Sequence, residues 1–200
     1  EQDAEYIVYN FYSKGNKRKK NLTSFQFYSR IRNIGYSHQE CGDIYMNDVD
    51  NLVKTGRPIV DAGMHHQVCI AIMGLPFKSE KVHTPEFYID IGRRLLDSDI
   101  QIDSICLKDA SGTTDPKTVY ETILGLRKIM PKDMILWQHT HDTASTAVSC
   151  YMAGIEAGVE GVDLSIRPMA SGTVQPDVRS LAHGLKGTGY ELDLDVSKIQ

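Results

Sequence analysis

The 200-residue chain has no long hydrophobic run, and no stretch approaches the ~18 consecutive apolar residues of a membrane-spanning helix. Its first residues, Glu1-Gln2-Asp3, do not resemble a secretory signal, which begins with positive charge and continues with an apolar run. The four cysteines stand apart, and no two of them have the close spacing of metal ligands. These absences predict a cytoplasmic protein.

The chain also lacks an excess of positive charge. Its net charge is −4, whereas nucleic-acid binding needs a concentrated positive field. The one basic run, residues 17–20, is short and is interpreted as a solvated loop or helix end. Nucleic acid is therefore not expected as the main partner. The 41% hydrophobic and 24% charged residues are ordinary for one globular domain with a real core.

From about residue 65 onward, short apolar runs alternate with helical patterns. Strands are expected over 67–73, 102–108, 134–139 and 162–166, and helices over 84–97, 116–130, 144–157 and 176–185. The strand starts lie roughly 30 residues apart, which indicates consecutive βα units and a parallel sheet. Earlier in the chain, a strand is expected over 25–30 and a helix over 47–62.

Polar side chains gather where the expected strands end. They include Lys108 and Asp109, then His139 and His141, and then the segment from Arg167 onward. Convergence of several strand ends on one face is how a barrel builds its site. No Gly-x-Gly-x-x-Gly turn joins a strand to a helix, which weakens the alternative of an open nucleotide-binding sheet. The predicted fold is α/β, a partial (β/α)8 TIM barrel with parallel strands and outer helices.

The sharpest chemical signal is the pair His139 and His141. Residues i and i+2 of a strand point to the same side, so both imidazoles can meet one ion at the strand's carboxyl end. A His-x-His pair by itself also occurs in packing and surface roles. Here it ends an apolar strand at the expected catalytic rim, and this position favours a metal site.

Lys108 ends the preceding strand, at the mouth of the expected barrel. A lysine buried there must pair, lose its proton or be modified, because burial disfavours its charge. Two interpretations stay open: a salt bridge to Asp109 or a neighbouring carboxylate, or a carbamylated lysine whose new carboxylate binds metal. In the later segment 167–176, Thr173 belongs either to a simple capped turn or to a loop that places its hydroxyl to relay a proton.

Six segments together resemble the carboxyltransferase domain of biotin-dependent 2-oxoacid enzymes, a group that includes pyruvate carboxylase, 2-oxoglutarate carboxylase and the oxaloacetate decarboxylase α subunit. The segments are MNDVDNL (46–52), VHTPEFY (82–88), SICLKDASG (104–112), WQHTHDTA (137–144), AGIEAGVEGVDLSIRPMASGTVQP (153–176) and LKGTGY (185–190). The order and spacing of the last four are specific. Residues 22–36 are a looser match.

The resemblance implies a divalent metal (zinc, manganese or cobalt) bound by an aspartate, a carbamylated Lys108, His139 and His141. It also implies that Thr173 shuttles the proton between the 2-oxoacid and biotin, and that Arg30 and Gln175 bind the substrate. The implied activity is biotin-dependent carboxyl transfer between carboxybiotin and a 2-oxoacid (pyruvate/oxaloacetate or 2-oxoglutarate), run in reverse by the decarboxylases. The implied partners are a biotin carboxyl carrier domain, a biotin carboxylase subunit and a second copy in a homodimer.

The chain departs from the family in two places. It contains no Asp-x-x-x-Arg-Asp-Gly motif, which carries the family's aspartate ligand, and the interval from Tyr36 to Asn47 is too short for the family's helix and strand. Residues 1–45 are therefore expected to be a poorly matched N-terminal segment, and 46–200 the barrel part of a truncated, internally deleted domain. Two alternatives stay open: a related metal-dependent aldol-type lyase or acyl-CoA condensing enzyme, and a catalytically inactive barrel remnant.

Overall fold

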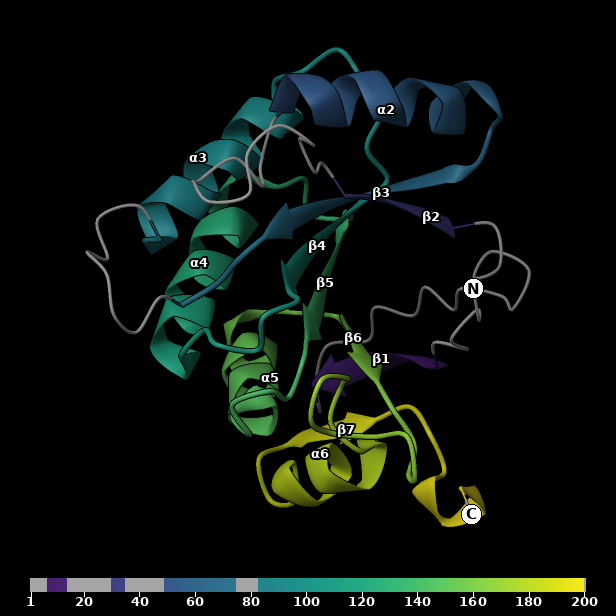
Figure 1. Ribbon diagram of the computed structural model, residues 1–200, viewed down its shortest axis with the longest axis vertical. Helices are drawn as coiled ribbons and strands as arrows, with labels where there is room; N and C mark the ends of the chain where they lie inside the picture. Colours follow the sequence, from purple (N-terminus) through teal and green to yellow (C-terminus); the bar gives the residue numbers. More distant parts are fainter. Residues whose placement is uncertain (1–6, 14–29, 35–48, 75–82, 200) are drawn as a thin grey trace.

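The computed structural model describes residues 7–13, 30–34, 49–74 and 83–199 of the chain. Five strands run parallel in consecutive order: β2 (Arg30–Ile34), β3 (His65–Ala71), β4 (Ser104–Asp109), β5 (Ile135–Thr140) and β6 (Gly161–Leu164). The helices are α2 (Val49–Asp61), α3 (Pro85–Leu96), α4 (Pro116–Ile129), α5 (Ala147–Ala157) and α6 (Val178–Gly184). They lie along one side of the sheet (Figure 1), as the predicted α/β barrel architecture requires.

Helix ends follow local chemistry. Thr84 and Asp115 cap α3 and α4 by accepting hydrogen bonds from the backbone N–H groups of Phe87 and Thr118, and a proline opens each helix. Helix α5 ends at Gly158, whose φ of 111° is unfavourable for other residues. The predicted helix over 47–62 and the later βα alternation are confirmed apart from element ends. The predicted strand over 25–30 lies outside the described residues, except for its last residue, which begins β2.

The sheet departs from a purely parallel arrangement at one edge. Strand β1 (Ile7–Ser13) pairs antiparallel with β6 on one side and with β7 (Tyr190–Leu192) on the other. An open β6 edge would expose backbone N–H and C=O groups, and β1 pairs with them instead. Strand β1 is thus an antiparallel addition to the predicted parallel sheet. It was not predicted, because the N-terminal segment shows no clear alternation.

The two faces of the sheet differ in chemistry. Residues such as Ile70, Leu107 and Leu136 face the helices and belong to the main apolar core. The opposite face carries rows of aligned side chains, one of which is Cys69, Cys106 and Trp137. Gly161 flanks this row, and a Cβ there would lie 2.3 Å from the Trp137 ring, so glycine is required for the indole to fit. The next row toward the carboxyl ends holds the candidate site.

Among the described helices, none is both long and apolar enough to cross a membrane. The chain ends with a short 3-10 helix, η1 (Val196–Lys198), beyond β7.

Candidate metal centre

Lys108 and His139 are direct partners in the register of β4 and β5. The Lys108 Nζ lies 3.1 Å from the His139 Nε2. His141 follows two residues later, and its Nε2 lies 3.1 Å from the same His139 nitrogen. The structure thus brings the three predicted metal-site residues together at the carboxyl ends of neighbouring strands.

His139 is the centre of this group. Its side chain is 1% exposed, and its Nδ1 lies 2.7 Å from the Oδ2 of Asp163 on β6. The Nε2 lies 2.9 Å from the side-chain amide nitrogen of Gln175. Asp163 was not among the residues singled out from the sequence. The sequence signal for Asp163 was a carboxylate within an apolar strand. Its partner could not be predicted, because it depends on the register between β5 and β6.

The segment between β6 and α6 folds back over the histidines. The backbone N–H of Asp142 donates to the Val174 carbonyl at 2.8 Å, and that of Ser171 donates to the Gln175 carbonyl at 2.8 Å. The Thr173 backbone lies close enough to the His141 ring to raise its pKa. Gln175 is buried and Thr173 is exposed. Thr173 therefore lies beside the histidines with its side chain open to an arriving molecule.

Burial lowers the pKa of His141, and the positive charge of Lys108 lowers it further. The Thr173 carbonyl and the charge of Asp109 act in the opposite direction, but the net shift is downward. The neutral form of the imidazole, which is the form that binds metal, is thereby favoured.

Asp109 is not the partner of Lys108. Alternation along β4 places the two side chains on opposite faces, and the buried Asp109 carboxylate accepts hydrogen bonds from the backbone N–H groups of Ser111, Gly112 and Thr114 at 2.8–3.0 Å. It therefore caps the following loop. Among the described residues, no carboxylate forms a salt bridge with Lys108, and the salt-bridge interpretation has no support there.

The two histidines fit a divalent ion. Two nitrogens bound tetrahedrally at ~2.0–2.1 Å would lie about 3.3 Å apart, close to the 3.1 Å between the His139 and His141 Nε2 atoms. In the part of the chain that the structure describes, no three His, Cys, Asp or Glu side chains form a ligand group. A lysine ammonium has no lone pair to offer, so Lys108 completes the set only as a carbamate.

Arg30, the predicted substrate-binding arginine, is not brought to this centre. It begins β2 and pairs with His65 at the start of β3, whereas Ala71 at the other end of β3 is level with Lys108. Six residues of strand separate the two levels, which is about 20 Å. The backbone of Arg30 therefore lies at the amino-terminal edge of the sheet.

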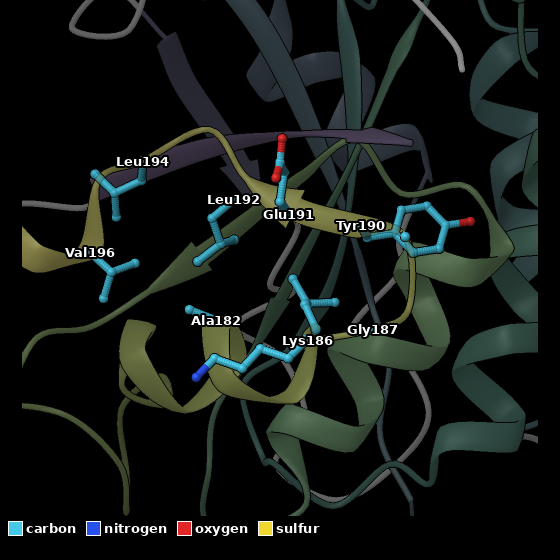
Figure 2. A pocket seen from close by; sticks show the side chains of 10 residues that line it. Ala182, Lys186, Gly187, Tyr190, Glu191, Leu192, Leu194 and Val196 are labelled. Atoms are coloured by element: carbon cyan, nitrogen blue, oxygen red, sulfur yellow. The ribbon is translucent and has the colours of Figure 1, made fainter. Parts of the chain in front are cut away.

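A separate pocket of about 490 Å³ lies between α6 and β7 (Figure 2). Its lining combines apolar side chains such as Leu185 and Leu192 with the charged Lys186 and Glu191. It contains none of the predicted site residues, so the chemistry of the strand ends does not extend into it.

The fold and the strand-end residues define an α/β protein of the barrel type with its polar centre at the carboxyl edge. The chain belongs to the HMGL-like family, whose model matches residues 46–200. This match and the relatives below confirm the resemblance to biotin-dependent carboxyltransferases.

Two curated relatives carry informative names. A pyruvate carboxylase subunit of Methanocaldococcus jannaschii is 34% identical over 82% of this chain and 28% of its own length. The methylmalonyl-CoA carboxyltransferase 5S subunit of Propionibacterium freudenreichii is 30% identical over 91% of this chain and 36% of its own length. The chain thus spans about a third of the length of these relatives.

A solved structure supports the fold. The carboxyl transferase domain of Rhizobium etli pyruvate carboxylase superposes with a TM-score of 0.63 at 24% identity, over 72% of this chain and 24% of that one.

Proposed function

We propose that this chain carries the metal centre of a biotin-dependent carboxyltransferase, which moves a carboxyl group between carboxybiotin and a 2-oxoacid. The observation that carries the proposal is the convergence of Lys108, His139 and His141 at the carboxyl ends of β4 and β5. The two named relatives, a carboxylase subunit and a carboxyltransferase subunit, supply the reaction class. Pyruvate or oxaloacetate is the proposed substrate, with 2-oxoglutarate as the other candidate.

His139, His141 and a carbamylated Lys108 would hold zinc, manganese or cobalt. When bound, the ion supplies Lewis-acid stabilisation of the negative charge that develops on the oxygens of the 2-oxoacid. The proposed ligand set is complete only when Lys108 is carbamylated. The Lys108 Nζ lies 3.1 Å from the Nε2 of His139, which in turn lies 3.1 Å from the Nε2 of His141.

Thr173 is the proposed proton carrier. Thr173 is exposed, and its backbone lies beside the His141 ring, so its hydroxyl can meet both substrate and cofactor. The buried Gln175 contacts His139 at the same centre. Its amide N–H groups are suited to donate to a substrate carboxylate. The proposal does not include Arg30 as a substrate contact, because its backbone lies at the opposite edge of the sheet.

The partners follow from the reaction. The proposal requires a biotin carboxyl carrier domain to deliver carboxybiotin and a biotin carboxylase subunit to charge it, and it includes a homodimer in the cytoplasm. The names of the relatives, both of them subunits, support the need for further chains or domains.

The second candidate function is a metal-dependent aldol-type lyase or acyl-CoA condensing enzyme. The match to the HMGL-like family model over residues 46–200 is the observation that supports it. Both candidates use the same two histidines. They differ in their need for Thr173 and for biotin.

The test is turnover of oxaloacetate to pyruvate by the purified chain, loaded with zinc or manganese and supplied with biocytin as a soluble acceptor. We expect biocytin-dependent pyruvate formation that falls by about 10²–10⁴-fold in Thr173→Ala, with metal content unchanged. Thr188→Ala, in the turn after α6, is the matched control.

Metal binding without biocytin-dependent turnover would count against the carboxyltransferase proposal. Cleavage of a 3-hydroxyacyl-CoA by the same sample would then support the lyase, and the absence of both activities would support the inactive remnant.

A further inference from the structure

Asp163 lies directly behind the central histidine. Gln138 of β5 pairs with Val162 of β6, so the next row places His139 level with Asp163. The side chains of the two residues are 1% and 0% exposed, and the Nδ1 and Oδ2 atoms lie 2.7 Å apart. An imidazole held this closely in a buried site has its ring orientation set by its partner.

The contacts of His139 agree with one arrangement of its ring hydrogen. A carboxylate only accepts, so the Nδ1 of His139 donates to Asp163, and the Nε2 of the neutral ring carries the lone pair. The Nε2 faces two groups that donate, the Lys108 ammonium at 3.1 Å and the Gln175 amide at 2.9 Å. The lone pair therefore points at the space shared with Lys108 and His141.

Asp163 is itself fixed by a helix. The Tyr151 hydroxyl of α5 donates to the Asp163 backbone carbonyl at 2.6 Å and accepts from the Thr140 backbone N–H at 2.8 Å. Tyr151 is fully buried. One hydroxyl thus joins the ends of β5 and β6 and holds the backbone of Asp163 in place.

We propose that Asp163 is a positioning residue that holds His139 in the Nδ1–H tautomer and directs its Nε2 lone pair to the ion. This inference rests on the proposed metal centre and assigns the residue that orients it. Asp163 contacts the Nδ1 of His139, on the side of the imidazole away from the centre, and therefore acts on the centre through His139. Partners of this kind behind a metal-binding histidine typically change metal affinity about 10–100-fold when removed.

The test is Asp163→Asn, a nearly isosteric change, in the full chain. The amide can donate an N–H to Nδ1, which would move the ring hydrogen of His139 to Nε2 and remove the lone pair. We expect zinc affinity, measured by competition with a chromophoric chelator, to fall about 10–100-fold. We also expect the ¹⁵N shifts of the His139 ring in metal-free protein to change from the Nδ1–H to the Nε2–H tautomer.

Asp103→Asn is the matched control. Asp103 accepts a hydrogen bond from the His66 backbone N–H at the amino-terminal edge of the sheet, far from the centre. It should change neither zinc affinity nor the His139 tautomer.

Three results would overturn the inference: an Nε2–H tautomer in the wild-type chain, an unchanged tautomer in Asp163→Asn, or zinc affinities that agree within about twofold. The ¹⁵N spectrum of the wild-type chain tests the tautomer of His139 even if Asp163→Asn does not fold. If the wild-type chain shows the Nδ1–H tautomer but binds no zinc, the proposed metal centre is wrong. The tautomer is measured in metal-free protein, so this failure can be distinguished from a failure of the tautomer assignment.

Discussion

Lys108 and His139 are opposite each other on adjacent parallel strands, with the Lys108 Nζ 3.1 Å from the His139 Nε2. This pairing places an amine where a metal ligand would be expected, and no carboxylate of the described residues neutralises it. A lysine in this position is suited to react with carbon dioxide, since the carbamate would exchange a positive for a negative charge beside the ion.

Lys108 should therefore become carbamylated when bicarbonate and a divalent metal are supplied. We expect a carbamate resonance in ¹³C NMR after addition of ¹³C-bicarbonate and zinc, and its loss in Lys108→Arg. Lys128→Arg, at the end of α4, serves as the control and should keep the resonance. A signal that persists in Lys108→Arg would contradict the assignment.

The two histidines should account for metal binding. Wild-type chain incubated with zinc and bicarbonate is expected to retain about one ion per molecule, as a single tetrahedral site requires. The double variant His139→Ala, His141→Ala is expected to retain almost none, because it loses both imidazole ligands. Elemental mass spectrometry of desalted protein checks this, with His183→Ala on α6 as the control. Retention of zinc by the double variant would place the ion elsewhere.

Tyr151→Phe should weaken both the fold and the centre. Removing the hydroxyl leaves the Asp163 carbonyl and the Thr140 N–H without this buried partner, which costs about 1–3 kcal/mol of unfolding free energy. Zinc affinity should also fall, because Asp163 is no longer fixed against His139. Urea unfolding and zinc titration measure the two effects.

Tyr120→Phe on α4 is the control for the loss of a hydroxyl and is expected to change stability by less than about 0.5 kcal/mol. Equal stability of the two tyrosine variants would show that the Tyr151 hydroxyl does not join the strands.

Much of this centre was predictable because its signals are local. His139 and His141 were found from strand alternation and from their place at a strand's end, and Lys108 from the same position one strand earlier. The starts of the helices predicted over 84–97 and 116–130 were readable for a similar reason, since a capping side chain and the following proline are adjacent in the sequence.

The remainder depended on contacts between distant segments. Asp163 acquires its role only when the register of β5 and β6 places it level with His139. Strand β1 could not be recognised, because its pairing is determined by the free edge of β6 some 150 residues later. Arg30 was assigned by resemblance, and the strand pairing places its backbone at the other end of the sheet.

Acid should weaken the N-terminal cap of α6, where the Asp177 carboxylate accepts a hydrogen bond from the Arg179 backbone N–H. Hydrogen bonds from the Arg179 side chain lower the pKa of Asp177, with further contributions from the Arg179 backbone N–H and the Arg167 charge. A carboxyl with a depressed folded-state pKa stabilises the fold above its unfolded value of about 3.9, and this stability is lost as the pH falls through the folded-state pKa.

Asp177→Asn keeps a capping side chain but removes the charge. It should therefore be less stable than wild type at neutral pH. The difference should begin to shrink as the pH falls below about 4 and should disappear below the folded-state pKa. Urea unfolding across this range checks the prediction. Arg179→Gln should reduce the same acid dependence, because it removes the main cause of the pKa shift. A constant difference at every pH would contradict this account.

The hydrogen bond from the Asp142 N–H to the Val174 carbonyl and the antiparallel bridge between Asp142 and Gly172 join the loop after β6 to the end of β5. The loop that carries Thr173 and the strand end that carries His141 are therefore held together as one structural unit. Anyone who redesigns the substrate range of this chain would need to transplant the two segments together. Replacing the loop alone would break the backbone bonds that set the distance between the hydroxyl and the histidines.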